Sequence, residues 1–236
     1  SLAYKVSDVV LAFVLRTIFI HTLGVSYLGL SGLFTNILTV LSLMELGVGA
    51  AIVFSLYRPL AENDYPKVAA LMRLYKKTYN TIGVTVCAVG ILLTPFLKYI
   101  INMPENVDNI YLIYWLSVAN TAISYFLAYR RSLLIADQRA DIDVKNQILF
   151  RYTRFVILAI CLVLARSFIV YLVLDVVNTL ASNIQITYVI KKKYKYIEEA
   201  VPEPLTKGEK KSIIKYMSSG VFSKIGQTVV TSTDSI

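Results

Sequence analysis

Long apolar blocks alternate with shorter charged segments along most of the chain. Each block runs for roughly 20 residues, the length of helix that crosses the hydrocarbon core of a bilayer. The alternating ten-residue pattern of a transmembrane β-strand does not occur, and backbone groups in lipid must be hydrogen-bonded within their own segment, so we expect helices. The predicted spans cover residues 4–23, 31–56, 80–101, 109–129, 149–165 and 168–190.

The pattern changes after residue 190. A lysine-rich stretch contains Pro202 and Pro204, which interrupt a helix, and Thr206 with Glu209 has the spacing of a capping box that would start a new one. The predicted fold is an all-α polytopic membrane bundle in three parts. These are a six-helix transmembrane lobe at 1–190, a cytoplasmic linker at 191–212, and the truncated first helix of a second lobe at 213–236.

A segment between the second and third spans also has helical periodicity. Its apolar residues recur on one side while lysines and arginines lie mostly on the other. This pattern indicates either an amphipathic helix at the cytoplasmic membrane interface or an ordinary connecting helix with a solvated charged face. The apolar positions are Val68, Leu71, Met72, Tyr75 and Tyr79.

Composition supports an integral membrane protein, with 56% hydrophobic and 17% charged residues and a net charge of +9. Most of the basic residues lie in the segments 58–77, 130–154 and 191–215, on one side of the predicted membrane. The positive-inside rule then places the N-terminus in the cytoplasm. The basicity is a topology signal, so we expect no nucleic-acid partner. Because the chain opens at Ser1 inside an apolar block and stops inside a seventh, more polar segment, we expect a fragment truncated at both ends.

Few residues suit catalysis or metal binding. Cys87 and Cys161 fall within spans, where packing is their expected role, and His21 lies near the outer end of the first span. The chain contains no phosphate-binding loop, dinucleotide glycine fingerprint, zinc-protease motif or serine elbow. We therefore expect no cofactor, no metal site and no enzymatic activity.

Polar residues form stripes inside three of the predicted spans. Polar side chains in a membrane face protein or water, so a stripe either lines a water-accessible cavity or joins helices as packing contacts. Both interpretations remain open at this stage. The stripes are Thr35, Thr39, Ser42, Glu45 and Gly49; Ser117, Asn120, Thr121 and Ser124; and Asp175, Asn178, Thr179 and Ser182.

Several ionisable residues fall in or near spans. A charge at the centre of a span costs about 2.5–3.5 kcal/mol on insertion scales, so each needs a partner or water. Arg16 and Glu45 could form a stretched ion pair, or both could face one wet cavity. The remaining candidates are Asp175, Lys224 and Asp234.

The stretch from RTIFIHTLGVSYLGLSGLF through MELGVGAAI to SLYRPLAENDYPKV and YKKTY closely resembles the N-terminal region of bacterial polysaccharide flippases, the Wzx-type oligosaccharide transporters. These proteins belong to the multidrug/oligosaccharidyl-lipid/polysaccharide exporter superfamily. The resemblance continues more loosely through RRSLLIADQR and into GQTVVTSTDSI.

The resemblance implies two six-helix bundles around a central cavity in the bacterial cytoplasmic membrane. It implies alternating-access transport of an undecaprenyl-pyrophosphate-linked oligosaccharide to the outer leaflet for polysaccharide biosynthesis. The implied partners are the lipid-linked oligosaccharide, membrane lipids, a coupling proton or cation, and a polysaccharide polymerase.

Within this hypothesis the intramembrane polar residues receive roles in substrate binding. Arg16 and Lys224 would contact the pyrophosphate, because cationic donors suit phosphate oxygens. Asn120 and Asn178 would contact the sugar. The two acidic residues Glu45 and Asp175 would bind a coupling cation or proton, or would hold the basic residues in position.

Two other readings are compatible with the pattern. The chain could be another transporter of the superfamily, either a drug/cation antiporter or a flippase for the lipid-linked peptidoglycan precursor. It could also be a non-transporting membrane scaffold of the polysaccharide machinery, in which the polar stripes would pack against other helices and stay dry.

Overall fold

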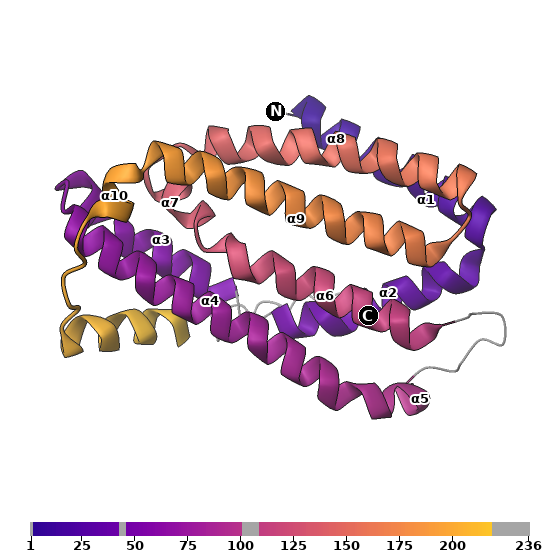
Figure 1. Ribbon diagram of the computed structural model, residues 1–236, viewed down its shortest axis with the longest axis horizontal. Helices are drawn as coiled ribbons and strands as arrows, with labels where there is room; N and C mark the ends of the chain where they lie inside the picture. The colour runs from indigo at the N-terminus through magenta and orange to yellow at the C-terminus, as the bar shows by residue number, and fades with distance from the viewer. Residues whose placement is uncertain (1, 43–45, 101–108, 219–236) are drawn as a thin grey trace.

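The computed structural model describes residues 2–42, 46–100 and 109–218. All regular secondary structure in this part of the chain is helical. Five of the described helical segments are long and apolar enough to cross a membrane, and they confirm the predicted all-α polytopic membrane bundle. Figure 1 shows the long helices side by side.

The helices follow one another with short connections. Leu2–Leu23 forms α1, and Gly24, at φ +90°, makes the turn into the next helix. Residues 207–218 form a further helix, which begins within the predicted linker 191–212. The others are α2 (Val25–Ser42), α3 (Leu46–Ala61), α4 (Tyr65–Leu93), η1 (Thr94–Phe96), α5 (Leu97–Ile100), α6 (Ile110–Ala128), α7 (Arg131–Ala136), α8 (Ala140–Leu164), α9 (Phe168–Lys193) and α10 (Lys195–Glu199).

The predicted second span starts too late. Helix α2 begins at Val25, directly after the Gly24 turn, rather than at residue 31. The described residues of that span belong to α2 and α3. Glu45 lies between these two helices, among residues 43–45, and is outside the described part of the chain.

The amphipathic segment and the third span form one helix, so their separation in the prediction was wrong. Asp64 caps α4 by accepting a hydrogen bond from the backbone N–H of Lys67 at 3.0 Å. Neither glycine nor proline occurs between Val68 and Ile82, so nothing ends the helix before the apolar segment begins. The predicted apolar face is packed against protein, with Tyr75 fully buried.

The predicted fifth span also begins too late. Helix α8 starts at Ala140 rather than at residue 149, and Asp141 and Asp143 lie in its first turn, where acidic side chains favour a helix start. Arg151 and Arg154 are therefore in the body of a long helix. In the sequence-based prediction they were counted with the basic segment 130–154 on one side of the predicted membrane.

Two apolar clusters lie toward opposite ends of the bundle, and polar residues separate them. One cluster contains Val118 of α6 and Leu172 of α9. The other contains Tyr125 of α6 and Ile186 of α9. The residues between these positions carry the predicted polar stripes. The fold thus places a polar layer between two apolar layers in the middle of the bundle.

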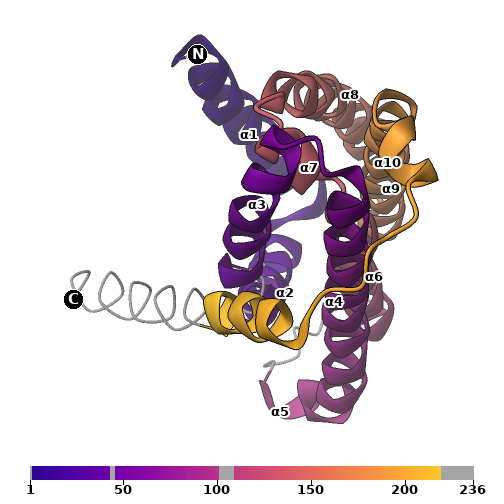
Figure 2. The same cartoon turned by 90° about the vertical axis from the view of Figure 1, so that its left-hand side faces the viewer.

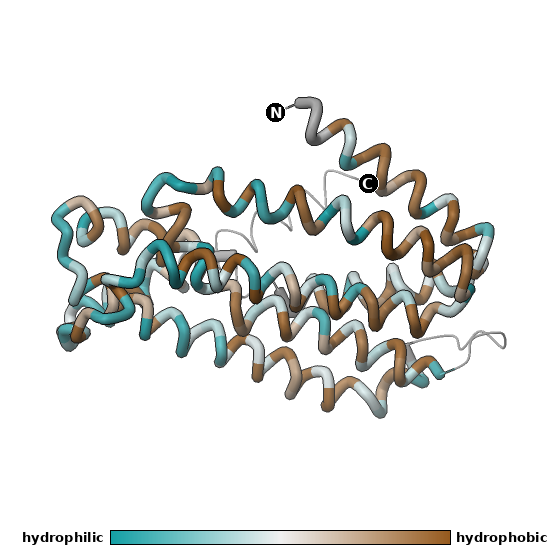
Figure 3. The backbone as a smooth tube through the Cα atoms, turned by 45° about the horizontal axis from the view of Figure 1, so that its top comes forward, coloured by the Kyte–Doolittle hydropathy of each residue, from teal (hydrophilic) through white to brown (hydrophobic). Residues whose placement is uncertain are grey.

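The basic connections gather at one end. Figure 1 shows the α3–α4 connection, α7 and α10 at its left-hand end, and Figure 3 shows the same end as largely hydrophilic. Helix α9 ends there with Lys191, Lys192 and Lys193. This arrangement agrees with the predicted clustering of basic loops on one side, and we call it the basic end.

The linker packs against the basic end. The capping box is confirmed, because the Thr206 N–H donates to Glu209 Oε2 at 2.8 Å and the Glu209 N–H donates to Thr206 Oγ1 at 3.2 Å. Glu209 also forms an ion pair with Lys67 of α4. Figure 2, viewed from this end, shows the linker passing α4 before the following helix reaches α3, where Ile213 joins the buried cluster.

Candidate functional site

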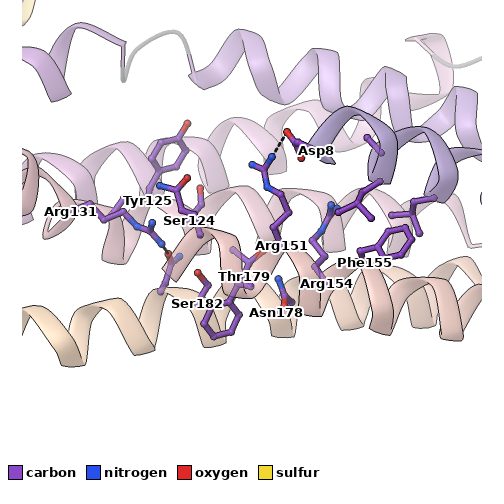
Figure 4. A pocket seen from close by; sticks show the side chains of 17 residues that line it. Asp8, Ser124, Tyr125, Arg131, Arg151, Arg154, Phe155, Asn178, Thr179 and Ser182 are labelled. Carbon is purple, nitrogen blue, oxygen red and sulfur yellow. Dashed lines mark hydrogen bonds and ion pairs between the residues drawn. The ribbon is translucent and has the colours of Figure 1, made fainter. Parts of the chain in front are cut away.

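A cavity of about 600 Å³ lies in the polar layer between α1, α6, α7, α8 and α9, and we call it cavity A. Asp8, Ser124, Tyr125, Gln147, Asn178, Thr179, Ser182 and Asn183 line it together with the three arginines Arg131, Arg151 and Arg154. Figure 4 shows these arginines, on α7 and α8, along the cavity with Asn178 and Ser182 of α9 nearby. Cavity A is therefore lined by guanidinium groups and by hydrogen-bonding side chains.

A second cavity of about 500 Å³, cavity B, adjoins the first. It lies between α2, α6, α8 and α9, and its polar lining includes Ser31, Thr35, Thr39, Ser117, Asn120, Thr121, Tyr171 and Asp175. Four residues line both cavities, namely Ser124, Tyr125, Arg154 and Thr179. The predicted stripes on the fourth and sixth spans thus line cavities, and their access to water stays a prediction.

Arg154 and Asp175 connect the cavities. Arg154 Nε forms an ion pair with Asp175 Oδ1, and Arg154 Nη2 donates to Asp175 Oδ2 at 3.2 Å. Asn120 Nδ2 donates to the same Oδ2 at 3.2 Å, which adds α6 to the network. The carboxylate is buried at 8% exposure, and the bidentate contact supplies the charge partner that burial requires.

A second pair joins α1 to α8. Arg151 Nη1 forms an ion pair with Asp8 Oδ2, drawn as a dashed line in Figure 4. Their sequence neighbours Ser7 and Tyr152 also interact, because Ser7 Oγ and the Tyr152 hydroxyl share a hydrogen bond at 3.0 Å. Polar contacts therefore hold this part of α1 against α8. Asp8 was not identified from the sequence as a candidate site residue.

A third pair lies nearer the basic end. Arg131 Nη1 forms an ion pair with Asp143, and Arg131 Nη2 donates to Asn183 Oδ1 at 3.0 Å. Gln147 Nε2 donates to the other oxygen of Asp143 at 2.8 Å. Each of the three arginines of cavity A thus has its own aspartate, which offsets the positive charge of the empty cavity.

The hydroxyl groups of the stripes are bonded within their own helices. Ser117 donates to the carbonyl of Ile113 at 2.9 Å, Thr121 to that of Ser117 at 3.0 Å, and Thr179 to that of Asp175 at 3.0 Å. Each hydroxyl oxygen keeps acceptor capacity toward the cavity. Direct bonds between helices involve the amides instead, since Asn146 Nδ2 donates to Ser182 Oγ at 3.0 Å.

This charged and hydrogen-bonding interior belongs to a chain whose sequence matches a family described as polysaccharide biosynthesis protein over residues 2–235. The chain belongs to this family. Comparisons with curated proteins and with solved structures gave no match. Family membership and the membrane-spanning helices together indicate a transporter-type membrane protein of polysaccharide biosynthesis.

For this member of the polysaccharide biosynthesis family, the structure brings three of the predicted site residues together. Asn120 and Asp175 are hydrogen-bonded at cavity B, and Asn178 lines cavity A on the same helix as Asp175. Arg16 is exposed on α1 and is not among the described residues that line either cavity. Glu45 and Lys224 lie outside the described residues, so the proposed Arg16–Glu45 relationship stays a prediction.

The sequence reasoning missed the arginines of cavity A as site residues. A signal for them exists, because Asp143, Gln147, Arg151 and Arg154 follow one another at spacings of four, four and three, which place them on one side of a helix. The same spacing identified the other stripes. It was overlooked because Asp143 and Gln147 fall before the predicted span, which left only the two arginines of the stripe inside it.

Proposed function

We propose that this chain carries the head group of a lipid-linked oligosaccharide, joined to undecaprenyl through pyrophosphate, across the cytoplasmic membrane. Its N-terminus and basic end would face the cytoplasm. Membership of the polysaccharide biosynthesis family and the membrane-spanning helices support a transport role, and the polar layer supports this class of substrate.

The physical problem in such transport is the polar head group. Each sugar hydroxyl left without a hydrogen bond in hydrocarbon costs several kcal/mol, and the charged pyrophosphate costs more. A route through protein must therefore supply both hydrogen-bonding groups and positive charge. Cavities A and B supply amides and hydroxyl oxygens from α6 and α9, and guanidinium groups from α7 and α8.

The observation that carries the proposal is the set of three arginine–aspartate pairs around cavity A. A guanidinium binds a phosphate group through the same forked geometry that binds a carboxylate. An entering pyrophosphate can therefore replace aspartate as the partner of an arginine. When no substrate is present, the aspartates hold the arginine side chains in place and balance their charge. When the substrate leaves, each arginine pairs with its aspartate again.

Alternating access explains how the head group would reach the polar layer. The apolar clusters toward the two ends of the bundle separate that layer from each membrane surface. Rocking of the helices, against each other or against a second bundle, would open one cluster at a time. The lipid tail would remain in the bilayer throughout. The roles predicted for Arg16, Glu45 and Lys224 remain predictions within this scheme, as does a coupling proton or cation.

The test is a translocation assay in proteoliposomes with a lipid-linked oligosaccharide. The double variant Arg154→Met/Asp175→Asn removes both charges and leaves no buried ion unpaired, so the fold is expected to survive. Transport is expected to fall at least about tenfold, because the substrate loses one charge-assisted hydrogen bond. The matched control is Arg139→Gln/Asp141→Asn, an exposed pair at the basic end. Normal transport by the cavity variant would overturn the proposal.

A further inference from the structure

A basic groove outside the polar layer runs along the exposed side of α4. Near the basic end a cavity of about 220 Å³ is lined by Arg73, Lys76, Tyr129 and Arg130. A second hollow of about 470 Å³ continues from it along Lys77, Asn80, Thr81 and Val84. Arg73 and Lys76 line both, so the two hollows form one continuous groove, which we call the α4 groove.

The cations of the groove lack counter-ions within the described part of the chain. Arg73, Lys76 and Lys77 are exposed, and none of them takes part in an ion pair among the described residues. Arg130, in contrast, is paired with Glu198 and lies over the ring of Tyr129, with its Cζ 5.2 Å from the ring centre. The groove therefore carries net positive charge toward an occupant.

The chemistry of the groove changes along the helix in a fixed order. At 100° per residue, Arg73, Asn80, Val84 and Ile91 lie within an arc of about 40°. The exposed face runs from cations, through amide and hydroxyl groups at Asn80 and Thr81, to apolar side chains, with Val84 at 59% and Ile91 at 60% exposure.

This order matches the structure of a phospholipid. The cations would meet the phosphate, the amide and hydroxyl would meet the ester region, and the apolar face would meet an acyl chain. Lys77 and Val84 are about 10 Å apart along the axis at 1.5 Å per residue, so the cations and the apolar face lie within the depth of one leaflet, about 20 Å. A soluble anion would contact the cations but would make no contact with the apolar side chains further along the groove.

We propose that the α4 groove binds the headgroup of an anionic phospholipid in the leaflet at the basic end. Helix α4 belongs to a segment long and apolar enough to span the membrane, so the exposed face beyond Val84 contacts lipid. Anionic lipids are concentrated in the cytoplasmic leaflet, where clusters of lysine and arginine beside a membrane helix attract them. The site is separate from cavities A and B and does not depend on the transported substrate.

The test is native mass spectrometry of the full chain, purified in detergent and titrated with phosphatidylglycerol, cardiolipin or phosphatidylcholine. The variant Arg73→Gln/Lys76→Gln/Lys77→Gln removes the cations of the groove. The control variant Lys207→Gln/Lys210→Gln/Lys211→Gln removes the same charge from exposed lysines of the helix at residues 207–218. Thermal melting of both variants establishes that they remain folded.

The expected result is preferential binding of the two anionic lipids, weakened about tenfold or more in the groove variant and little changed in the control. Equal loss in both variants would show non-specific attraction and would overturn the site. Equal binding of phosphatidylcholine would also overturn it. Binding of polyprenyl pyrophosphate but of neither anionic phospholipid would overturn the site, because the occupant would then be a substrate. Displacement of the lipid by millimolar inorganic pyrophosphate would overturn it too, because the occupant would then be a free anion.

Discussion

Arg154 of α8 and Asp175 of α9 face each other where cavities A and B meet, with Nη2 3.2 Å from Oδ2. The aspartate is buried, whereas the arginine side chain is 42% exposed toward the cavities. The pair therefore joins two helices and also presents a guanidinium to whatever enters. Stability and binding depend on the same contact, and they can be separated by experiment.

Replacing Arg154 alone is expected to destabilise the fold, because Asp175 would remain buried without its cation. Breaking a fully buried pair costs about 3–5 kcal/mol, and the partial exposure of this arginine reduces the expected cost to roughly 1–3 kcal/mol. Denaturation in mixed micelles would measure the loss for Arg154→Met. Adding Asp175→Asn should recover most of it, and a double variant as unstable as the single one would contradict this account of the pair.

The close contact of α4 and α6 depends on glycine. A Cβ added at Gly90 would lie 3.0 Å from Cγ1 of the buried Val118, whereas one added at Gly29 of α2 would meet nothing within 4 Å. Gly90→Val should therefore cost about 1–3 kcal/mol of unfolding free energy through overpacking, and Gly29→Val much less. Thermal melting of both variants in the same detergent checks the difference. Equal melting temperatures would show that α4 and α6 are not this close.

Docking of the linker is expected to weaken at low pH. The hydrogen bond from Lys67, followed by those from the Thr206 backbone N–H and hydroxyl, lowers the pKa of Glu209 from 4.5 to about 2. A lowered pKa in the docked state stabilises docking at pH above about 4.5, and this stabilisation is lost as the pH falls toward 2. The distribution of distances between spin labels at Ser212 and on α4 should therefore broaden as the pH falls from about 4.5 to about 2.

Glu209→Gln should remove most of this pH dependence and should broaden the distance at neutral pH. Glu203→Gln serves as the control, because Glu203 contacts α4 through its backbone N–H, which donates to Pro66 at 3.3 Å. An unchanged pH profile in Glu209→Gln would show that another group controls docking.

The cavities are expected to admit water. Cysteines introduced at Ser117, Asn178 and Ser182, in a background with Cys87 and Cys161 replaced, should react with a small water-soluble thiol reagent. A cysteine at Val118, which is 1% exposed, should not react. Protection of all the cavity positions would favour a dry scaffold, in which the polar stripes only join helices.

The sequence predicted the polar stripes but not their charge partners. The spacing of Ser117 to Ser124 and of Asp175 to Ser182 is a property of single helices, so helical periodicity was enough to place those residues on one side. The pairing of Asp175 with Arg154 depends on which helices are neighbours and on their relative height, which one sequence does not contain. The same limit applies to Asp8 and Arg151, which are far apart in the chain and join α1 to α8.

Helix boundaries were predictable where a breaker or a cap marks them. The capping box at Thr206 and the end of the fourth span near Ala128 follow the prediction. The start of α8 does not, because this helix begins with polar turns that hydropathy treats as loop. The first part of α4 was predicted as helical, but its largely polar residues 76–81 separated it in the prediction from the apolar span that continues the same helix. Extending α8 to Ala140 adds Asp143 and Gln147 to the side of the helix that carries Arg151 and Arg154.

Photocrosslinking from inside cavity A would test the central claim most directly. A photoreactive amino acid at Asn178, which lines the cavity, is compared with one at Val177, which is exposed on the outer face of the same helix. In membranes containing lipid-linked oligosaccharide, the account predicts a sugar-bearing adduct at position 178 and none above background at position 177. Absence of a sugar-bearing adduct at position 178, in a variant that still folds and transports, would contradict it.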